Sequence, residues 1–101
     1  MTPTRAEFHV LLALFEGPRH GYRLMQDVEE LSAGRLQIGP GTLYTAIKRL
    51  RAARLISETD ADAERRRCYK LTSKGRAVAE EEAQRMHDLV RLARKRGLLL
   101  T

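Results

Sequence analysis

A short segment of the chain combines hydroxyl groups with cations at helical spacing. Thr42 and Thr45 are followed by Lys48 and Arg49, and Tyr44 lies between the two threonines. Residues three and four apart lie on one face of a helix, so the hydroxyls and the cations are neighbours. Hydroxyl, ammonium and guanidinium groups all donate hydrogen bonds to anionic oxygens such as those of phosphate. The segment therefore predicts a helix face that binds anions.

The opposite face of the same segment is apolar, as docking on other helices requires. Gly39-Pro40-Gly41 precedes it, and proline suits the first turn of a helix because its missing N–H has no partner there anyway. The apolar positions follow the i, i+3, i+4, i+7 rule: Leu43, Ala46, Ile47 and Leu50. We expect a helix that begins at Pro40 and turns its polar face outward.

The positive charge is concentrated in the middle of the chain. The 101 residues carry 19 Lys and Arg against 13 Asp and Glu, a formal net charge of +6. From Arg35 to Arg76 eleven basic residues face four acidic ones, which gives +7, and the remainder has eight basic and nine acidic residues. No acid occurs between Arg35 and Arg54. A solubilising surface would spread its charges, whereas such an excess favours a surface that faces phosphates.

A second cationic group lies in a predicted β-hairpin. Leu55 to Thr59 alternates with the two-residue period of a strand, a polar stretch over 60–64 turns the chain, and Arg67 to Leu71 is the return strand. Arg65-Arg66-Arg67 begins that strand, where at most two of its side chains share a face. We expect some of these arginines to bind phosphate. The alternative is a solubilising cluster in exposed salt bridges with the acids of the turn.

The remaining elements complete a recognisable order. Thr4 and Glu7 form a capping box for a first helix from Thr4 to Glu16, and a second helix follows His20-Gly21. Thr72 caps a last helix from Ser73 to about Arg96. The fold class is therefore mainly α with a two-stranded β-hairpin, a winged helix-turn-helix whose third helix enters the DNA major groove. The expected DNA-binding residues are Pro40, Gly41, Thr42, Tyr44, Thr45, Lys48, Arg49, Arg65, Arg66, Arg67 and Lys70.

The last helix is too long for the domain that precedes it. It spans about 36 Å, whereas a core of about 70 residues has a diameter of about 28 Å. We expect a DNA-binding domain over 1–71 and, over 72–101, a helix that packs on it, overhangs it and dimerises. The alternative is that its apolar stripe packs only on its own domain. The predicted interface is Ala79, Ala83, Met86, Leu89, Val90 and Ala93.

The residue pattern gives no indication of a catalytic site, a metal site or a membrane span. Cys68 is the only cysteine, and His9, His20 and His87 have no metal-ligand spacing. No run approaches the roughly 20 apolar residues of a membrane span, and the N-terminal residues lack the apolar core of a signal peptide. We expect a cytoplasmic protein that is not an enzyme and has neither a metal nor a cofactor.

Several stretches resemble the PadR family of transcriptional regulators, in particular its short members with a single C-terminal helix. The matching stretches are Leu11 to Leu24 (LLALFEGPRHGYRL), Pro40 with Gly41 to Leu50 (GTLYTAIKRL), Leu55-Ile56, and Arg66 to Arg76 (RRCYKLTSKGR). The resemblance implies a homodimeric winged helix-turn-helix repressor whose third helix and wing contact operator DNA. It also implies that the last helix dimerises and that some relatives bind flat aromatic effectors between subunits.

Two positions depart from the family pattern. Members usually have glycine before the Leu-Ile strand, where the third helix ends in a left-handed residue, but this chain has Arg54. That helix must end differently or accept strain of about 1 kcal/mol. Cys68 replaces an aromatic residue of the hairpin, and both a thiol sensor and an inert strand cysteine stay open.

These observations predict a sequence-specific DNA-binding regulator, a repressor that binds a pseudo-palindromic operator as a homodimer. The alternative is a winged-helix interaction module that binds an acidic partner through the same basic face. A small aromatic effector is a further expectation from the resemblance. Phe8 and Phe15, seven apart on one helix face, could line its pocket, and core packing is the alternative for both.

Overall fold

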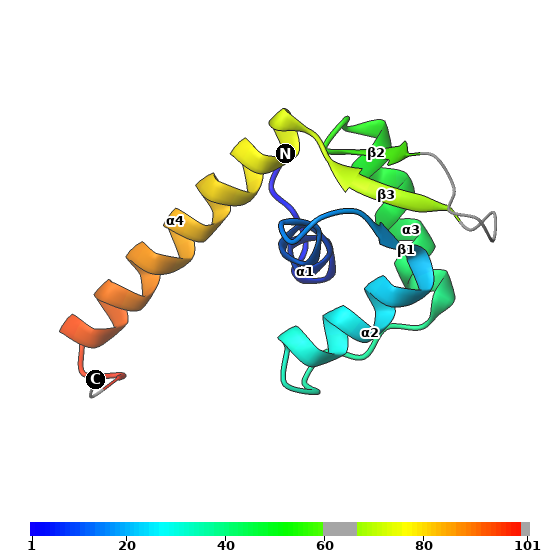
Figure 1. Ribbon diagram of the computed structural model, residues 1–101. Coiled ribbons are helices and arrows are strands. Elements are labelled where there is room, and N and C mark those ends of the chain that lie inside the picture. Colours follow the sequence, from blue (N-terminus) through cyan, green and yellow to red (C-terminus); the bar gives the residue numbers. More distant parts are fainter. Residues whose placement is uncertain (60–66, 100–101) are drawn as a thin grey trace.

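The computed structural model describes residues 1–59 and 67–99 of the chain. Its element order confirms the predicted order of helices and hairpin strands and adds one short strand (Figure 1). No helix in the described part is long and apolar enough to cross a membrane. The elements are α1 (Arg5–Leu14), β1 (Arg19–His20), α2 (Gly21–Leu31), α3 (Pro40–Ala52), β2 (Ile56–Thr59), β3 (Cys68–Leu71) and α4 (Ser73–Lys95).

The start of α1 confirms the predicted capping box. The Glu7 backbone N–H donates to the Thr4 hydroxyl at 3.1 Å, and the Thr4 N–H donates to Glu7 Oε1 at 2.8 Å. The helix ends at Leu14 rather than at Glu16. Gly17, with φ of 125°, turns the chain there, and its N–H donates to the Leu14 carbonyl at 3.1 Å. A left-handed glycine satisfies the last carbonyls of a helix without strain.

The predicted two-stranded hairpin is confirmed as β2 and β3, and the sheet gains a third strand that was not predicted, in the order β1-β3-β2. β3 pairs antiparallel with both neighbours, with His20 opposite Cys68 on one side and Glu58 opposite Tyr69 on the other. β1 contains only two residues, too few for an alternating pattern. Pairing with β3 makes it a strand, which is a contact between residues nearly 50 positions apart.

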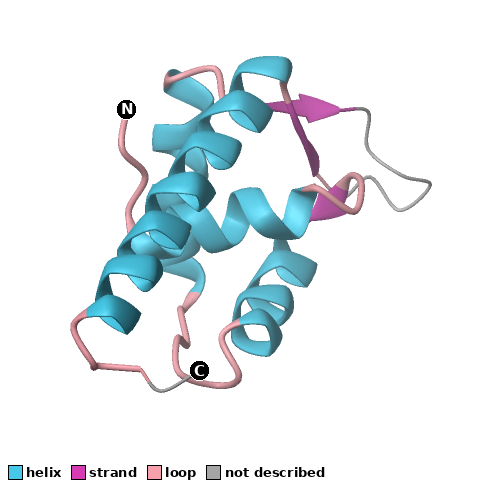
Figure 2. Ribbon diagram, turned by 90° about the vertical axis from the view of Figure 1, so that its left-hand side faces the viewer, coloured by secondary structure: helices cyan, strands magenta, loops and turns pink. Residues whose placement is uncertain are grey.

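The core lies where α1, α2 and α3 meet the sheet. Figures 1 and 2 show the sheet at one side of the helical body, with α1 in its middle. Every helix except α4 contributes several fully buried side chains, so the three helices and the hairpin form one core. Besides Glu7, the largest fully buried residues are Tyr69, Leu11, Leu24, Leu43, Leu50, Leu55, Val10 and Val28.

α4 buries residues only in its first half. The Thr72 hydroxyl accepts from the Gly75 N–H at 3.0 Å and donates to the Arg54 carbonyl at 2.6 Å, which confirms the predicted cap. Gly75, Ala79 and Glu82 are the buried residues of this helix. Figure 1 shows the rest of α4 running away from the domain, and the longest extent of the chain with this helix included is 51 Å. The predicted overhang is confirmed.

Arg54 lies in the left-handed region with φ of 63°. Its N–H donates to the Arg51 carbonyl at 2.9 Å, and the Leu55 N–H donates to the Leu50 carbonyl at 2.9 Å. This pair of hydrogen bonds is the Schellman arrangement, whose turning residue is usually glycine. Of the two outcomes expected for Arg54, the chain therefore keeps the family geometry and accepts the strain.

We predict that Arg54→Gly raises the free energy of unfolding by about 0.5 kcal/mol. Relief of the left-handed strain contributes about 1–2 kcal/mol, and the greater freedom of glycine in the unfolded chain offsets about 0.5–1 kcal/mol. Urea denaturation measures the difference. Arg54→Ala is the control, because it removes the side-chain charge and keeps the strain. Equal stability of the two variants would contradict the prediction.

Candidate nucleic-acid interface

α3 separates its polar and apolar faces as predicted. Leu43, Ala46, Ile47 and Leu50 are all buried, with at most 5% of each exposed. Thr42, Thr45, Lys48 and Arg49 are exposed, and Tyr44 is 52% exposed. Among the described residues, Lys48 has no acidic partner within ion-pair distance. Its ammonium group is therefore available to an external anion.

The N-terminus of α3 is open toward solvent. Gly39 is the N-cap residue and supplies no side-chain acceptor, and Pro40 lies in the first turn as predicted. Gly41 and Thr42, both exposed, carry N–H groups that have no acceptor within the helix. Helix N-termini attract anions through such groups and through the helix dipole. Gly41 is thus placed where its backbone N–H can donate to a phosphate, whereas Pro40 lies in the same turn but has no N–H to donate.

Arg49 differs from the other predicted residues because a buried acid holds it. Its Nη1 lies 3.3 Å from Oε2 of Glu7, a side chain that is 1% exposed. Within the described part of the chain Oε2 accepts no well-aligned hydrogen bond, so the contact is an ion pair. Breaking a buried ion pair costs several kcal/mol, which keeps the guanidinium against α1. Sequence reasoning assigned Glu7 only a capping role, because the pair joins two helices and has no local signature.

Two shallow grooves flank α3 and divide its polar face. The first, of about 550 Å³, runs along the N-termini of α1 and α3 and brings four predicted residues together. Its lining consists of Thr4, Ala6, Glu7, Gly41, Thr42, Thr45, Ala46 and Arg49. Thr42 and Thr45 thus face one groove, and Tyr44 and Lys48 face the other.

The second groove, of about 480 Å³, lies between α3 and β3. It is lined by Tyr44, Ile47, Lys48, Arg51, Ala52, Arg67 and Tyr69. Burial raises the pKa of Tyr69 above its usual 10.0, and the nearby Glu58 carboxylate raises it further. Tyr69 therefore keeps its hydroxyl proton near neutral pH. Arg51 was missed by sequence reasoning, although it lies three residues after Lys48 and continues the same helix face.

The predicted DNA-binding residues of the hairpin differ in where the structure places them. Arg67 directly precedes β3, and 73% of its side chain is exposed. Lys70 is exposed but neighbours Tyr69 on the strand, so it lies on the opposite face of the sheet. The structure therefore does not bring Lys70 together with the α3 cations. Arg65 and Arg66 lie outside the described residues.

One carboxylate joins α3 to the hairpin formed by β2 and β3. Glu58 of β2 places Oε2 3.3 Å from Arg51 Nη2 and Oε1 3.6 Å from Arg67 Nε. All three side chains are at least one-third exposed. Exposed pairs of this kind contribute about 0–1 kcal/mol, far less than a buried pair. Arg51 and Arg67 can therefore change partners easily, unlike Arg49.

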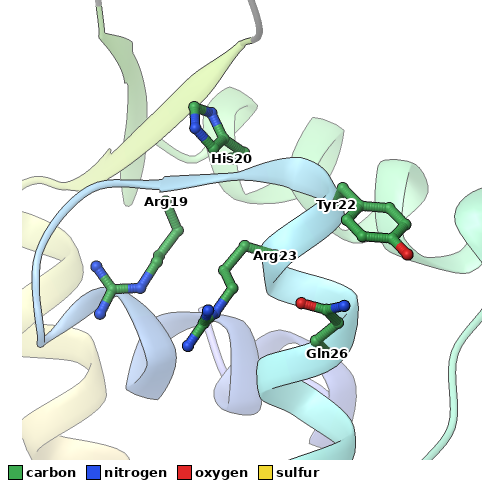
Figure 3. A pocket seen from close by; sticks show the side chains of 5 residues that line it. All are labelled: Arg19, His20, Tyr22, Arg23 and Gln26. Carbon is green, nitrogen blue, oxygen red and sulfur yellow. The ribbon is translucent and has the colours of Figure 1, made fainter. Parts of the chain in front are cut away.

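The junction of β1 and α2 forms a third hollow, of about 510 Å³, lined by Arg19, His20, Tyr22, Arg23 and Gln26 (Figure 3). Both guanidinium groups already have an acidic partner. Arg23 Nε lies 3.0 Å and Arg19 Nε 3.7 Å from the buried Asp27 carboxylate. The hollow therefore offers less free positive charge than the surface of α3.

The sheet also brings the single cysteine close to a histidine. Cys68 Sγ lies 3.0 Å from His20 Nδ1 across the β1–β3 pair. In the described part of the chain, no group of three or more histidine, cysteine or acidic side chains is arranged to hold a metal ion.

The overhanging part of α4 is apolar on one side. Met86 is 42% exposed, Leu89 66%, and Ala83 and Val90 are exposed as well. Ala79 differs from the other predicted interface residues, because it is 4% exposed and belongs to the chain's own core. The dimer prediction therefore depends on the other five residues, among which Ala93 is half-buried.

Phe8 of α1 and Phe15, the residue that follows the end of α1, are both half-buried. The guanidinium carbon of Arg76 lies 4.7 Å from the centroid of the Phe15 ring, and the Phe8 ring makes an edge contact with His9. Phe15 also packs against the hydrophobic core. Both rings therefore have neighbours within the chain, and the effector pocket at these residues stays a prediction.

Comparison with known proteins places these features in a family. The chain is 36% identical over 85 residues to the transcriptional regulator Rv3488 of Mycobacterium tuberculosis. This match covers 82% of this chain and 77% of that protein. It is 40% identical over 93 residues to an uncharacterized 37.1 kDa protein in transposon TN4556 of Streptomyces fradiae, of which it spans only 25%.

The fold is similar to that of solved regulators. A PadR family transcription regulator from Clostridium difficile has a TM-score of 0.81 at 22% sequence identity, over 91% of this chain and 97% of that one. Residues 10–81 match the model of the transcriptional regulator PadR-like family. That match covers more than two-thirds of the chain and includes α2, α3 and the hairpin strands. The chain belongs to the PadR-like family of transcriptional regulators.

Proposed function

We propose that this protein is a sequence-specific DNA-binding transcriptional regulator and that it acts as a homodimer on a pseudo-palindromic operator. The observation that carries the proposal is the outer face of α3. This face presents hydroxyls to solvent, together with a lysine that has no acidic partner among the described residues, while its other face is buried. A helix docked in this way can enter a major groove with its donors toward bases and phosphates. Membership of the PadR-like family supports the same assignment.

Dimerisation is supported by the apolar surface of α4. Leu89 and Leu92 on the overhanging end of α4, and Leu98 just after it, are each at least half exposed. Contiguous apolar surface of this kind marks an interaction site in soluble proteins. A second copy would cover it and would set two α3 helices about one DNA turn, ~34 Å, apart. Two copies also double the number of phosphate contacts, which raises affinity for a paired site.

Repression and release by a small aromatic effector are the finer parts of the proposal. They rest on the family resemblance and on the position of Phe8 on α1 and of Phe15 at its C-terminal end, since α1 is the helix against which α4 packs. A ligand between subunits could alter the α1–α4 contact and with it the spacing of the two α3 helices. Titration of the operator complex with flat aromatic compounds tests this part. Release by such a compound is the expected result, and retention of the complex would contradict it.

Lys48→Glu is the direct test of the DNA-binding proposal. We expect the dissociation constant for the operator to rise at least about tenfold, because one phosphate contact is lost and a repulsive charge is added. Band-shift titrations of the upstream region of the gene, at several salt concentrations, measure it. The wild-type plot of log K against log salt should be steep, and in the variant its slope should fall by about one unit. Arg49 is left unchanged because Glu7 holds it.

Lys95→Glu is the matched control, since it makes the same charge change at the far end of α4. It should leave affinity and salt slope close to those of the wild type. A flat salt dependence of the wild type, or equal affinity for any duplex, would contradict sequence-specific regulation. If Lys48→Glu leaves duplex affinity unchanged but abolishes binding to an acidic protein partner, the interaction-module alternative holds instead.

A further inference from the structure

Two arginines that line the groove between α3 and β3 bind the same carboxylate. Arg51 comes from α3 and Arg67 from the residue before β3, and each faces a different oxygen of Glu58, at 3.3 and 3.6 Å. A phosphate diester also presents two anionic oxygens, and arginine is well suited to bind them. Glu58 thus occupies the position of an anion between two guanidinium groups.

This anion is weakly held. The exposed fractions are 45% for Arg51, 73% for Arg67 and 33% for Glu58, so water screens both pairs. The buried pair of Glu7 with Arg49, on the other side of α3, shows the contrast, because its carboxylate is 1% exposed. An incoming phosphate can therefore displace Glu58 from Arg51 and Arg67 without leaving a buried charge unpaired.

Further donors surround the same groove. Lys48 and Tyr44 line it from α3, whereas Tyr69, on its β3 side, is 1% exposed and belongs to the core. When α3 lies in a major groove and the hairpin approaches the neighbouring minor groove, one DNA backbone separates the two. That backbone passes over the space between α3 and β3. Its phosphates then meet three cations and one competing acid.

We infer that the groove between α3 and β3 is a binding site for a backbone phosphodiester of DNA, and that Glu58 is a built-in competitor which must release Arg51 and Arg67. The inference rests on the proposed DNA-binding function and adds Arg51 to the contact residues. It also assigns Glu58 a regulatory role: it weakens binding to any duplex until enough phosphate contacts form at once. A low basal affinity of this kind favours discrimination between operator and bulk DNA.

Glu58→Gln tests the competitor role. The dissociation constant for the operator should fall about three- to tenfold at low salt, and the slope of log K against log salt should steepen by about one unit. Arg51→Gln should raise the constant about three- to tenfold on every duplex and flatten the slope by about one unit. Glu81→Gln is the matched control, because Glu81 pairs with Arg85 at 2.7 Å on α4, away from α3. It changes the net charge equally and should change binding little.

A comparison in a double-mutant background separates competition by Glu58 from the general effect of removing a negative charge. In the Arg51→Gln, Arg67→Gln background, the gain from Glu58→Gln should shrink to that of Glu81→Gln. Weaker operator binding by Glu58→Gln, or an unchanged salt slope, at a wild-type melting temperature would overturn the inference. In that case the steep salt dependence of the wild type would still support the DNA-binding proposal. A flat wild-type dependence would instead remove both.

Inorganic phosphate distinguishes the source of the anion. At constant ionic strength, millimolar phosphate should shift the melting temperature of the wild type and of Arg51→Gln equally, because one free ion gains too few contacts to displace Glu58. A stabilisation that is present in the wild type and lost in Arg51→Gln would assign the site to a free phosphate and overturn the assignment to a DNA strand.

Discussion

Gly75→Ala is expected to lower the free energy of unfolding by about 3 kcal/mol. A Cβ at this position would overlap the Leu55 carbonyl oxygen and come within 2.8 Å of the Leu55 carbonyl carbon. The same carbonyl accepts from the Thr72 N–H at 3.1 Å, so it cannot move away without loss of that bond. Overpacking usually costs about 1–3 kcal/mol, and here both neighbours are backbone. Urea denaturation of the purified variant measures the loss.

Gly41→Ala is the matched control. Gly41 also lies in a helix, but a Cβ there meets no atom within 4 Å. Its free energy of unfolding should stay equal to that of the wild type or rise by up to about 1 kcal/mol, since alanine favours helix. Similar losses in the two variants would show that the contact between α4 and the Leu55 carbonyl does not exclude a Cβ. A large difference would explain physically why glycine occurs at position 75 in the family-like stretch from Arg66 to Arg76.

Arg49→Met is expected to lower the free energy of unfolding by about 2–3 kcal/mol. The substitution keeps an unbranched chain of similar length but leaves the Glu7 carboxylate, 1% exposed, without its cation. Loss of one partner from a buried ion pair costs about 3–5 kcal/mol, and the half-exposed guanidinium reduces that figure. Thermal or urea denaturation measures the change.

Two further variants test the cause. Glu7→Gln in the Arg49→Met background should restore most of the lost stability, because no buried charge then remains. Arg51→Met makes the same substitution on the same helix, but its partner Glu58 is 33% exposed. That control should change stability by less than about 1 kcal/mol. Equal losses from Arg49→Met and Arg51→Met would rule out a special role for burial of Glu7.

Most of the fold could be predicted because its signals are local. The capping box at Thr4 and the cap at Thr72 depend on residues within a few turns of one another. The same holds for the apolar period of α3 and the overhang of α4. The structure confirms them. β1 could not be predicted, since two residues have no period and become a strand only when His20 lies opposite Cys68.

The candidate site was predictable only in part for the same reason. Hydroxyls and cations on one face of α3 follow from helical spacing, so Thr42, Thr45 and Lys48 were found. Glu7 and Glu58 were not, because each meets an α3 arginine through the packing of separate elements. Sequence reasoning therefore treated Arg49 as a free cation, whereas a buried acid holds it.

The amino-acid sequence by itself determined the order of the helices and the hairpin, the concentration of charge between Arg35 and Arg76, and the polar face of α3. These properties depend on spacing along one element and on counts of residues. Only the tertiary structure decided which cations are available, because burial of a partner sets the cost of releasing it. Glu7 lies in the interior and fixes Arg49, whereas Glu58 lies near the surface and leaves Arg51 and Arg67 free to change partners.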